Sequence, residues 1–141
     1  MATIHAAVAI EAPKDRVFAL VRDQAQRGRF LPDGWRFVGT VTEATDQIGS
    51  QMEVEMPIGP SVRRLIETLA ITDNELYEGP PDGEPFLTKW TLVDAGSETL
   101  VDLQMEFEYG GWLGELFVKR RLQKALAQQL IRLGQAAREA T

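Results

Sequence analysis

The sequence predicts an α+β domain in which a curved antiparallel sheet of about seven strands packs against one long C-terminal helix. In residues 99–109 apolar and polar side chains alternate, which is the period-2 pattern of a strand with one buried face. After Gly110 and Gly111 the apolar residues recur at spacings of three and four, which indicates an amphipathic helix over about 113–140. The turns between the preceding strands are too short for parallel crossovers, so neighbouring strands must pair antiparallel.

The N-terminal segment is expected to form one strand and two short helices. Apolar side chains alternate in residues 3–10, which predicts the first strand. Pro13 suits the first turn of a helix over 14–22, because its fixed φ is helical and its missing N–H is not needed there. A second short helical piece is expected over 24–30, before the turn Pro32-Asp33-Gly34.

The middle of the chain reads as strand after strand, separated by turn residues. The predicted strands are 35–43, 49–56, 61–72, 75–78 and 85–93, followed by the strand 99–109. The strand 61–72 has two possible phases, one burying 62, 64, 66 and 68 and the other 65, 67, 69 and 71. A bulge would make both partly true. If Arg64 or Glu67 faces the interior, it needs a partner or a ligand, because a lone buried charge is costly.

The long C-terminal helix sets the architecture. At ~1.5 Å per residue it would be roughly 40 Å long, whereas a compact domain of this size has a radius of gyration of about 14 Å. It must therefore cross the whole domain, and the inner face of the sheet exceeds what one helix can cover. We therefore expect a cavity between sheet and helix, with a well-packed core as the alternative.

Composition limits the classes of function. The 141 residues fit one domain, 1–141, and 21 acidic against 15 basic residues give a net charge of -6. This charge opposes nucleic acid or an anionic membrane as the main partner. The basic run Lys119-Arg120-Arg121 is interpreted as a solvated helix face. No signal-peptide run and no membrane-spanning apolar stretch is found, so a soluble, cytoplasmic protein is expected. The sequence does not indicate an oligomeric state.

Reactive side chains are scarce. There is no cysteine, which excludes disulfides, thiolate metal ligands and cysteine nucleophiles. The single histidine, His5, falls on the polar side of the first strand and has no second histidine or spaced carboxylates to complete a metal site. No catalytic residue, metal site or cofactor is therefore assigned.

Several local sequences together resemble the helix-grip fold of the START/Bet v 1-like (SRPBCC) superfamily, and within it the polyketide cyclase/dehydrase and lipid-transport group. They are Ile-Glu-Ala-Pro at 10–13, Val-Phe-Ala-Leu-Val-Arg-Asp at 17–23, Phe30-Leu31-Pro32, Gly49, and the strand 103–109 that runs through Gly110-Gly111 into Leu-Gly-Glu-Leu at 113–116. The resemblance covers essentially the whole chain. It implies a curved sheet gripping the C-terminal helix around a hydrophobic cavity. It also implies a function among carriers and sensors of lipids, hormones and polyketides, or among cyclases and dehydratases.

The candidate ligand-binding residues are predicted to face the interior of the domain, and most of them have apolar, adaptable side chains. Methionine adapts its shape and aromatic rings offer flat contact surfaces, which suits an oily or planar ligand. Each residue taken alone is equally explained by an ordinary core. The candidates are Met52, Val54, Met56, Arg64, Phe86, Thr88, Trp90, Met105, Phe107, Tyr109, Leu126 and Leu130.

The sequence favours binding or transport of a small hydrophobic ligand, lipid-, polyketide- or aromatic-like, in an internal cavity between sheet and helix. The absence of a nucleophile, metal site or histidine pair supports binding over catalysis. The alternative is a cyclase or dehydratase that uses one or two polar cavity residues such as Tyr109, Arg64 or Glu67. A third, weaker hypothesis is a protein-interaction module that works through its outer surface.

Overall fold

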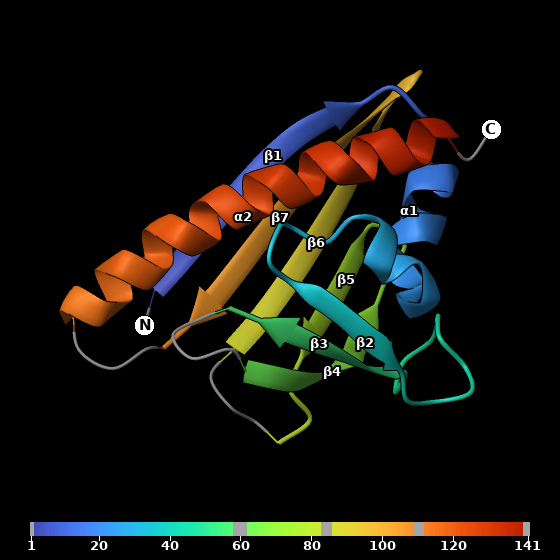
Figure 1. Cartoon of the computed structure of the whole chain (residues 1–141). Coiled ribbons are helices and arrows are strands. Elements are labelled where there is room, and N and C mark those ends of the chain that lie inside the picture. Colours follow the sequence, from blue (N-terminus) through green and yellow to red (C-terminus); the bar gives the residue numbers. More distant parts are fainter. Residues whose placement is uncertain (1, 58–61, 83–85, 109–111, 140–141) are drawn as a thin grey trace.

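One antiparallel sheet and one long helix dominate the fold (Figure 1). The structure, a computed structural model, describes residues 2–57, 62–82, 86–108 and 112–139. Within these residues the strand order is β1-β7-β6-β5-β4-β3-β2, and every neighbouring pair is antiparallel. The elements are β1 (Ala2–Ile10), α1 (Lys14–Arg22), the 3₁₀ helix η1 (Gln24–Arg29), β2 (Arg36–Thr40), β3 (Gln51–Met56), β4 (Val62–Ile71), β5 (Glu75–Gly79), β6 (Phe86–Ala95), β7 (Glu98–Phe107) and α2 (Trp112–Glu139).

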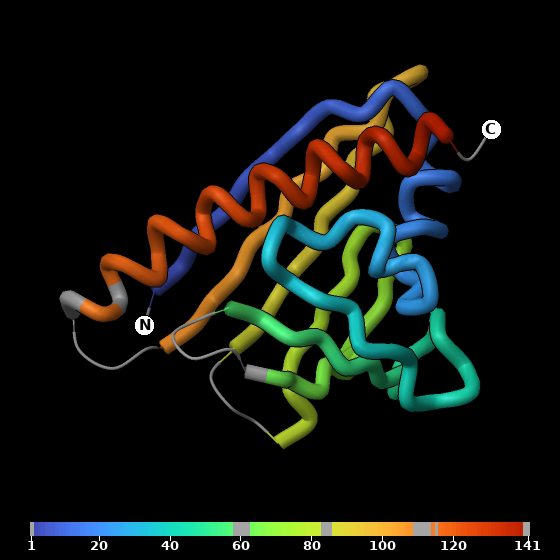
Figure 2. Tube along the Cα trace, viewed as in Figure 1, coloured from blue at the N-terminus to red at the C-terminus, as the bar shows by residue number. Residues whose placement is uncertain are grey.

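The strand order places the first and the last strand side by side. β1 pairs with β7 along its whole length, from Ala2 opposite Phe107 to Ile10 opposite Thr99. Figures 1 and 2 show α2 running along β1 and β7, with α1 and η1 beside its C-terminal part. One face of the sheet is therefore covered jointly by α2, η1 and α1, as the predicted helix-grip arrangement requires.

The core lies between this face and the helices. Leu126, Leu130 and Leu133 of α2 are fully buried, and so is Trp90 of β6. Phe30, directly after η1, meets the Trp90 ring edge-on at a centroid distance of 6.1 Å. Aromatic pairs favour this arrangement because the positive edge of one ring faces the negative face of the other.

Most predicted boundaries agree with the structure to within two residues, and β2 is the exception. The strand predicted over 35–43 ends at Thr40. Beyond it the Thr42 hydroxyl oxygen accepts the Gln51 N–H at 3.0 Å and its O–H donates to the Ala44 carbonyl at 2.6 Å. The Val41 N–H still donates to the Gln51 carbonyl at 2.8 Å, but the Thr42 side chain takes the Gln51 N–H in place of a backbone carbonyl, and the regular ladder ends there.

The ambiguous strand β4 uses both phases. Ile66 and Thr68 are buried, whereas Leu69 is 39% exposed. The pairing register with β5 shifts between Thr68 and Ala70, and beyond the shift Ile71 packs against the core. The expectation of a bulge is therefore confirmed.

A buried ion pair ties η1 to the sheet. The Arg27 guanidinium donates to both Glu78 carboxylate oxygens, at 2.9 and 2.8 Å, and only 5% and 2% of the two side chains are exposed. The Trp90 indole N–H donates to Glu78 at 3.1 Å, and Arg27 also donates to the Val21 carbonyl at 3.0 Å. The Arg27 guanidinium lies 5.4 Å from the ring centroids of both Phe30 and Trp90. Both charges are thus compensated within the core.

We expect Arg27→Met to reduce the free energy of unfolding by about 3–5 kcal/mol, because it leaves the Glu78 charge buried without its partner. Arg36→Met, which breaks an exposed pair with Glu55, is the control and should cost less than about 1 kcal/mol. Urea denaturation measures both. Equal losses would contradict a special role for the buried pair.

Two glycines should respond oppositely to alanine. A Cβ at Gly134 of α2 would meet only ordinary contacts at 3.7 Å, so Gly134→Ala should stabilise the protein by up to about 1 kcal/mol through helix propensity. A Cβ at Gly79 would lie 2.8 Å from the Phe86 carbonyl oxygen, so Gly79→Ala should destabilise it. Thermal and urea denaturation measure the change in stability caused by each substitution. A Gly79→Ala variant as stable as the parent protein would refute the close approach of Gly79 to the Phe86 carbonyl oxygen.

Candidate functional site

A small inner cavity lies between the sheet and α2. Its volume is about 30 Å³, which holds two or three water molecules at ~10–15 Å³ each. Its walls come from η1, from Leu31 and Trp35 in the segment before β2, from five strands and from Gln129 of α2. The interior that the sequence predicts as a cavity is thus filled almost completely by its own side chains.

Most of the candidate ligand-binding residues line this inner cavity, namely Met52, Val54, Met56, Phe86, Thr88, Trp90 and Met105. Phe107, Leu126 and Leu130 are buried in the core but are not among its lining residues. Arg64 is half-buried, with its guanidinium 5.5 Å from the Phe86 ring centroid. Tyr109 lies outside the described residues. Glu67 is half-buried and accepts a hydrogen bond from Gln51 at 2.7 Å, and it does not line the cavity.

The polar groups of the inner cavity include two that the sequence analysis missed, Arg27 and Glu78. Arg27 belongs to a short helix whose apolar residues do not recur at helical spacing, so no sequence pattern indicated that its side chain is buried. Glu78 was detectable in principle, because it shares a strand face with the fully buried Leu76. Gln129 of α2 is 5% exposed and completes the polar part of the wall.

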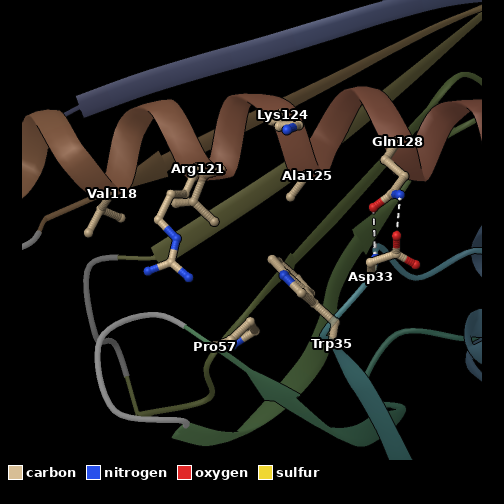
Figure 3. Close-up of a pocket in the computed structure, with 9 residues that line it drawn as sticks. Asp33, Trp35, Pro57, Val118, Arg121, Lys124, Ala125 and Gln128 are labelled. Carbon is tan, nitrogen blue, oxygen red and sulfur yellow. Dashed lines mark hydrogen bonds between the residues drawn. The ribbon is translucent and has the colours of Figure 1, made fainter.

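A larger space, the side cleft, opens between α2 and the segments around Trp35 and Pro57 (Figure 3). Its volume is about 320 Å³, within the usual range for small-molecule sites of roughly 300–1,000 Å³. The apolar lining residues are Trp35, Pro57, Val118, Leu122 and Ala125, and the polar ones are Asp33, Arg121, Lys124 and Gln128. None of them belongs to the candidate set, because that set was chosen from the centre of the sheet and helix.

Trp35 lines both the side cleft and the inner cavity. Its half-buried indole is therefore a wall between the two spaces. The methionines at 52 and 56 stand on the inner side of this wall.

The loop that carries Trp35 is fastened to α2 through Asp33. Gln128 accepts the Asp33 backbone N–H at 2.7 Å and donates to the Asp33 carboxylate at 2.8 Å. Arg132 pairs with the same carboxylate and donates to the Leu31 carbonyl at 2.5 Å. The hydrogen bonds from Arg132 and then Gln128, together with the positive charge of Arg132, lower the pKa of Asp33 below its ordinary value of 3.8.

A second hollow lies on the opposite, outer face of β1, β7 and β6. It is wider and more open, about 660 Å³, and its apolar floor includes Val93 and Leu100, which are 51% and 47% exposed. Lys89, Asp102 and Gln104 interrupt it. These charged and polar side chains make it an ordinary mixed surface.

The described residues offer little reactive chemistry. They contain no group of three or more His, Asp or Glu side chains that could hold a metal ion. The Glu78 oxygens already accept two guanidinium N–H groups and one indole N–H, which leaves them poorly placed to take a proton from a substrate. No helix in the described part of the chain is long and apolar enough to cross a membrane.

Asp33→Asn should destabilise the protein at neutral pH and make little difference in acid. A lowered carboxyl pKa contributes stability above the unfolded-state value of 3.8 and loses it as the pH falls through the lower folded-state value. Thermal denaturation from about pH 7 to pH 2.5 measures the gap, which is the difference in melting temperature between the variant and the parent protein. The gap should shrink in an Arg132→Gln background. A gap independent of pH would contradict the ionic contribution.

Comparison with known proteins identifies the family. Residues 1–138 match the family described as polyketide cyclase/dehydrase and lipid transport. No curated protein sequence matches the chain.

Solved structures share the fold at low sequence identity. The KanY protein superimposes with a TM-score of 0.82 at 16% identity over 97% of each chain. A protein from Thermus thermophilus gives 0.75 at 19% identity, and a START superfamily protein from Mycobacterium smegmatis gives 0.75 at 16%, both over 99% of each chain. At these identities the likeness concerns the fold alone. The chain thus has an SRPBCC-type fold and belongs to the polyketide cyclase/dehydrase and lipid-transport family.

Proposed function

We propose that the protein binds a small hydrophobic molecule, with the body of the ligand in the side cleft and its end directed past Trp35 toward the inner cavity. The observation that carries the proposal is the continuity of apolar surface at Trp35, which lines both spaces. The family supports a ligand-binding use of this fold.

Burial of apolar surface supplies the binding energy in this arrangement. Val118 and Leu122 of α2 face Trp35 and Pro57 across the cleft, so a ligand between them displaces water from both walls. Deeper entry needs the side chains around the inner cavity to move, since 30 Å³ is too small for an organic ligand. Met52, Met56 and Met105 can change rotamer with little strain, which suits ligands of varied outline.

A second candidate function is catalysis of cyclase or dehydratase type. Glu78, Arg27, Thr88 and Gln129 place polar groups at the end of the proposed ligand path. Glu78 would have to give up hydrogen bonds to Arg27 or Trp90 before it could act as a base. Binding without chemistry is therefore the favoured proposal.

A substitution that fills the cleft tests binding directly. Ala125 lines the side cleft, so Ala125→Trp should weaken binding of the neutral fluorescent probe N-phenyl-1-naphthylamine by at least about tenfold. Ala127→Trp, on the exposed side of the same helix, is the matched control and should bind like the parent protein. Fluorescence titration gives the dissociation constants, and circular dichroism checks that both variants fold.

Equal affinity of the two variants, or no binding by the parent protein, would refute the proposed function. Native mass spectrometry of protein purified from its own host then identifies any retained molecule. A ligand recovered in chemically altered form would favour the catalytic candidate instead.

A further inference from the structure

Two cations of α2 face the side cleft. Arg121 and Lys124 are three residues apart and so lie on one face of the helix, and both line the cleft among Val118, Leu122 and Ala125. Figure 3 shows the Arg121 side chain extending from α2 into the space between Val118 and Trp35. The α2 side of the cleft, whose other lining residues are Val118, Leu122, Ala125 and Gln128, thus carries two positive charges.

These charges are not compensated within the part of the chain that the structure describes. Neither Arg121 nor Lys124 forms a hydrogen bond or ion pair there, although acidic residues outnumber basic ones by 21 to 15. Other surface cations do have carboxylate partners, such as Arg36 with Glu55 at 3.1 Å and Lys89 with Glu75 at 3.0 Å.

The basic run found in the sequence therefore divides into two parts. All three residues of the run are exposed, as expected of a solvated face, but Lys119 and Arg120 lie outside the cleft, whereas Arg121 lines it together with Lys124, which is also exposed.

The cleft is polarised along its length. Arg121 precedes Gln128 by seven residues, which is roughly 10 Å along the helix at ~1.5 Å per residue. The Asp33 carboxylate lies at the Gln128 end and is already paired with Arg132. Lys124 lies between Arg121 and Gln128, four residues before Gln128. A negative group on a ligand would meet the unpaired Arg121 at one end and the unpaired Lys124 about one helical turn from Gln128, and beside Arg121 it would stay about a Debye length from the Asp33 carboxylate.

We propose that the ligand is an amphipathic anion, an apolar body with one carboxylate or similar acidic group, and that Arg121 and Lys124 bind this group at the mouth of the side cleft. Guanidinium and ammonium groups form charge-assisted hydrogen bonds to such oxygens. The apolar body then lies against Leu122 and Trp35. This inference rests on the proposed function, since it names the chemical class of the ligand for the same cleft.

Two probes that differ by one charged group test the inference. 8-Anilinonaphthalene-1-sulfonate is N-phenyl-1-naphthylamine with an added sulfonate. Arg121→Gln/Lys124→Gln should weaken binding of the sulfonate probe by about tenfold and remove most of its salt dependence, and leave the neutral probe within about twofold. Lys119→Gln/Arg120→Gln removes the same charge from the same helix outside the cleft, and should leave the affinity for both probes nearly unchanged.

The results distinguish failure of the anion site from failure of ligand binding in the side cleft. If both double variants weaken the sulfonate probe equally, or if Arg121→Gln/Lys124→Gln weakens both probes alike, the anion site is refuted while binding in the cleft stands. If the neutral probe does not bind, or binds Ala125→Trp as well as Ala127→Trp, the proposed function itself fails.

Discussion

The ion pair between Arg27 and Glu78 is the contact on which the rest of the inner face depends. It joins η1 to β5 across the core, and Arg27 also holds the last turn of α1 through the Val21 carbonyl. Gln24 adds hydrogen bonds from η1 to the Ser50 carbonyl at 2.9 Å and to the Thr68 hydroxyl at 3.2 Å. Because η1 is short and lacks a strong apolar face, these buried polar contacts fix its position where hydrophobic packing alone would not.

The position of η1 in turn shapes the side cleft. The chain leaves η1 through Phe30 and Leu31, and Arg132 and Gln128 then fasten it to α2 at Asp33. Trp35 follows two residues later and stands between cleft and inner cavity. α2 lies along β1 and β7, at the opposite edge of the sheet from β2 (Figure 1). The side cleft lies between α2 and the segments around Trp35 and Pro57, which adjoin β2 and β3. The cleft is thus a consequence of strand order, and a ligand within it would be held by shape and charge with little reactive chemistry.

Much of the fold was predictable because it rests on local periodicity. The alternation in β7 and the stripe from Val118 to Leu133 in α2 are period-2 and period-3.6 patterns that any buried face imposes. The candidate site was predicted only in part. The alternation of apolar and polar residues along the strands placed Met52, Trp90 and Met105 correctly on the inner face of the sheet. The same alternation cannot show whether an inward-facing side chain borders an empty space or is packed on all sides.

The helices and strands, the antiparallel pairing and the apolar character of the interior all follow from spacings within about ten residues, so the sequence alone predicts them. The packing of these elements leaves the interior nearly filled and opens the side cleft beside α2, which is larger than the inner cavity. It alone brought Asp33 to Arg132, Arg27 to Glu78, and Trp35 opposite Leu122, pairs separated by up to 99 residues. Such contacts depend on how whole elements pack, and no local pattern records the volume left between them.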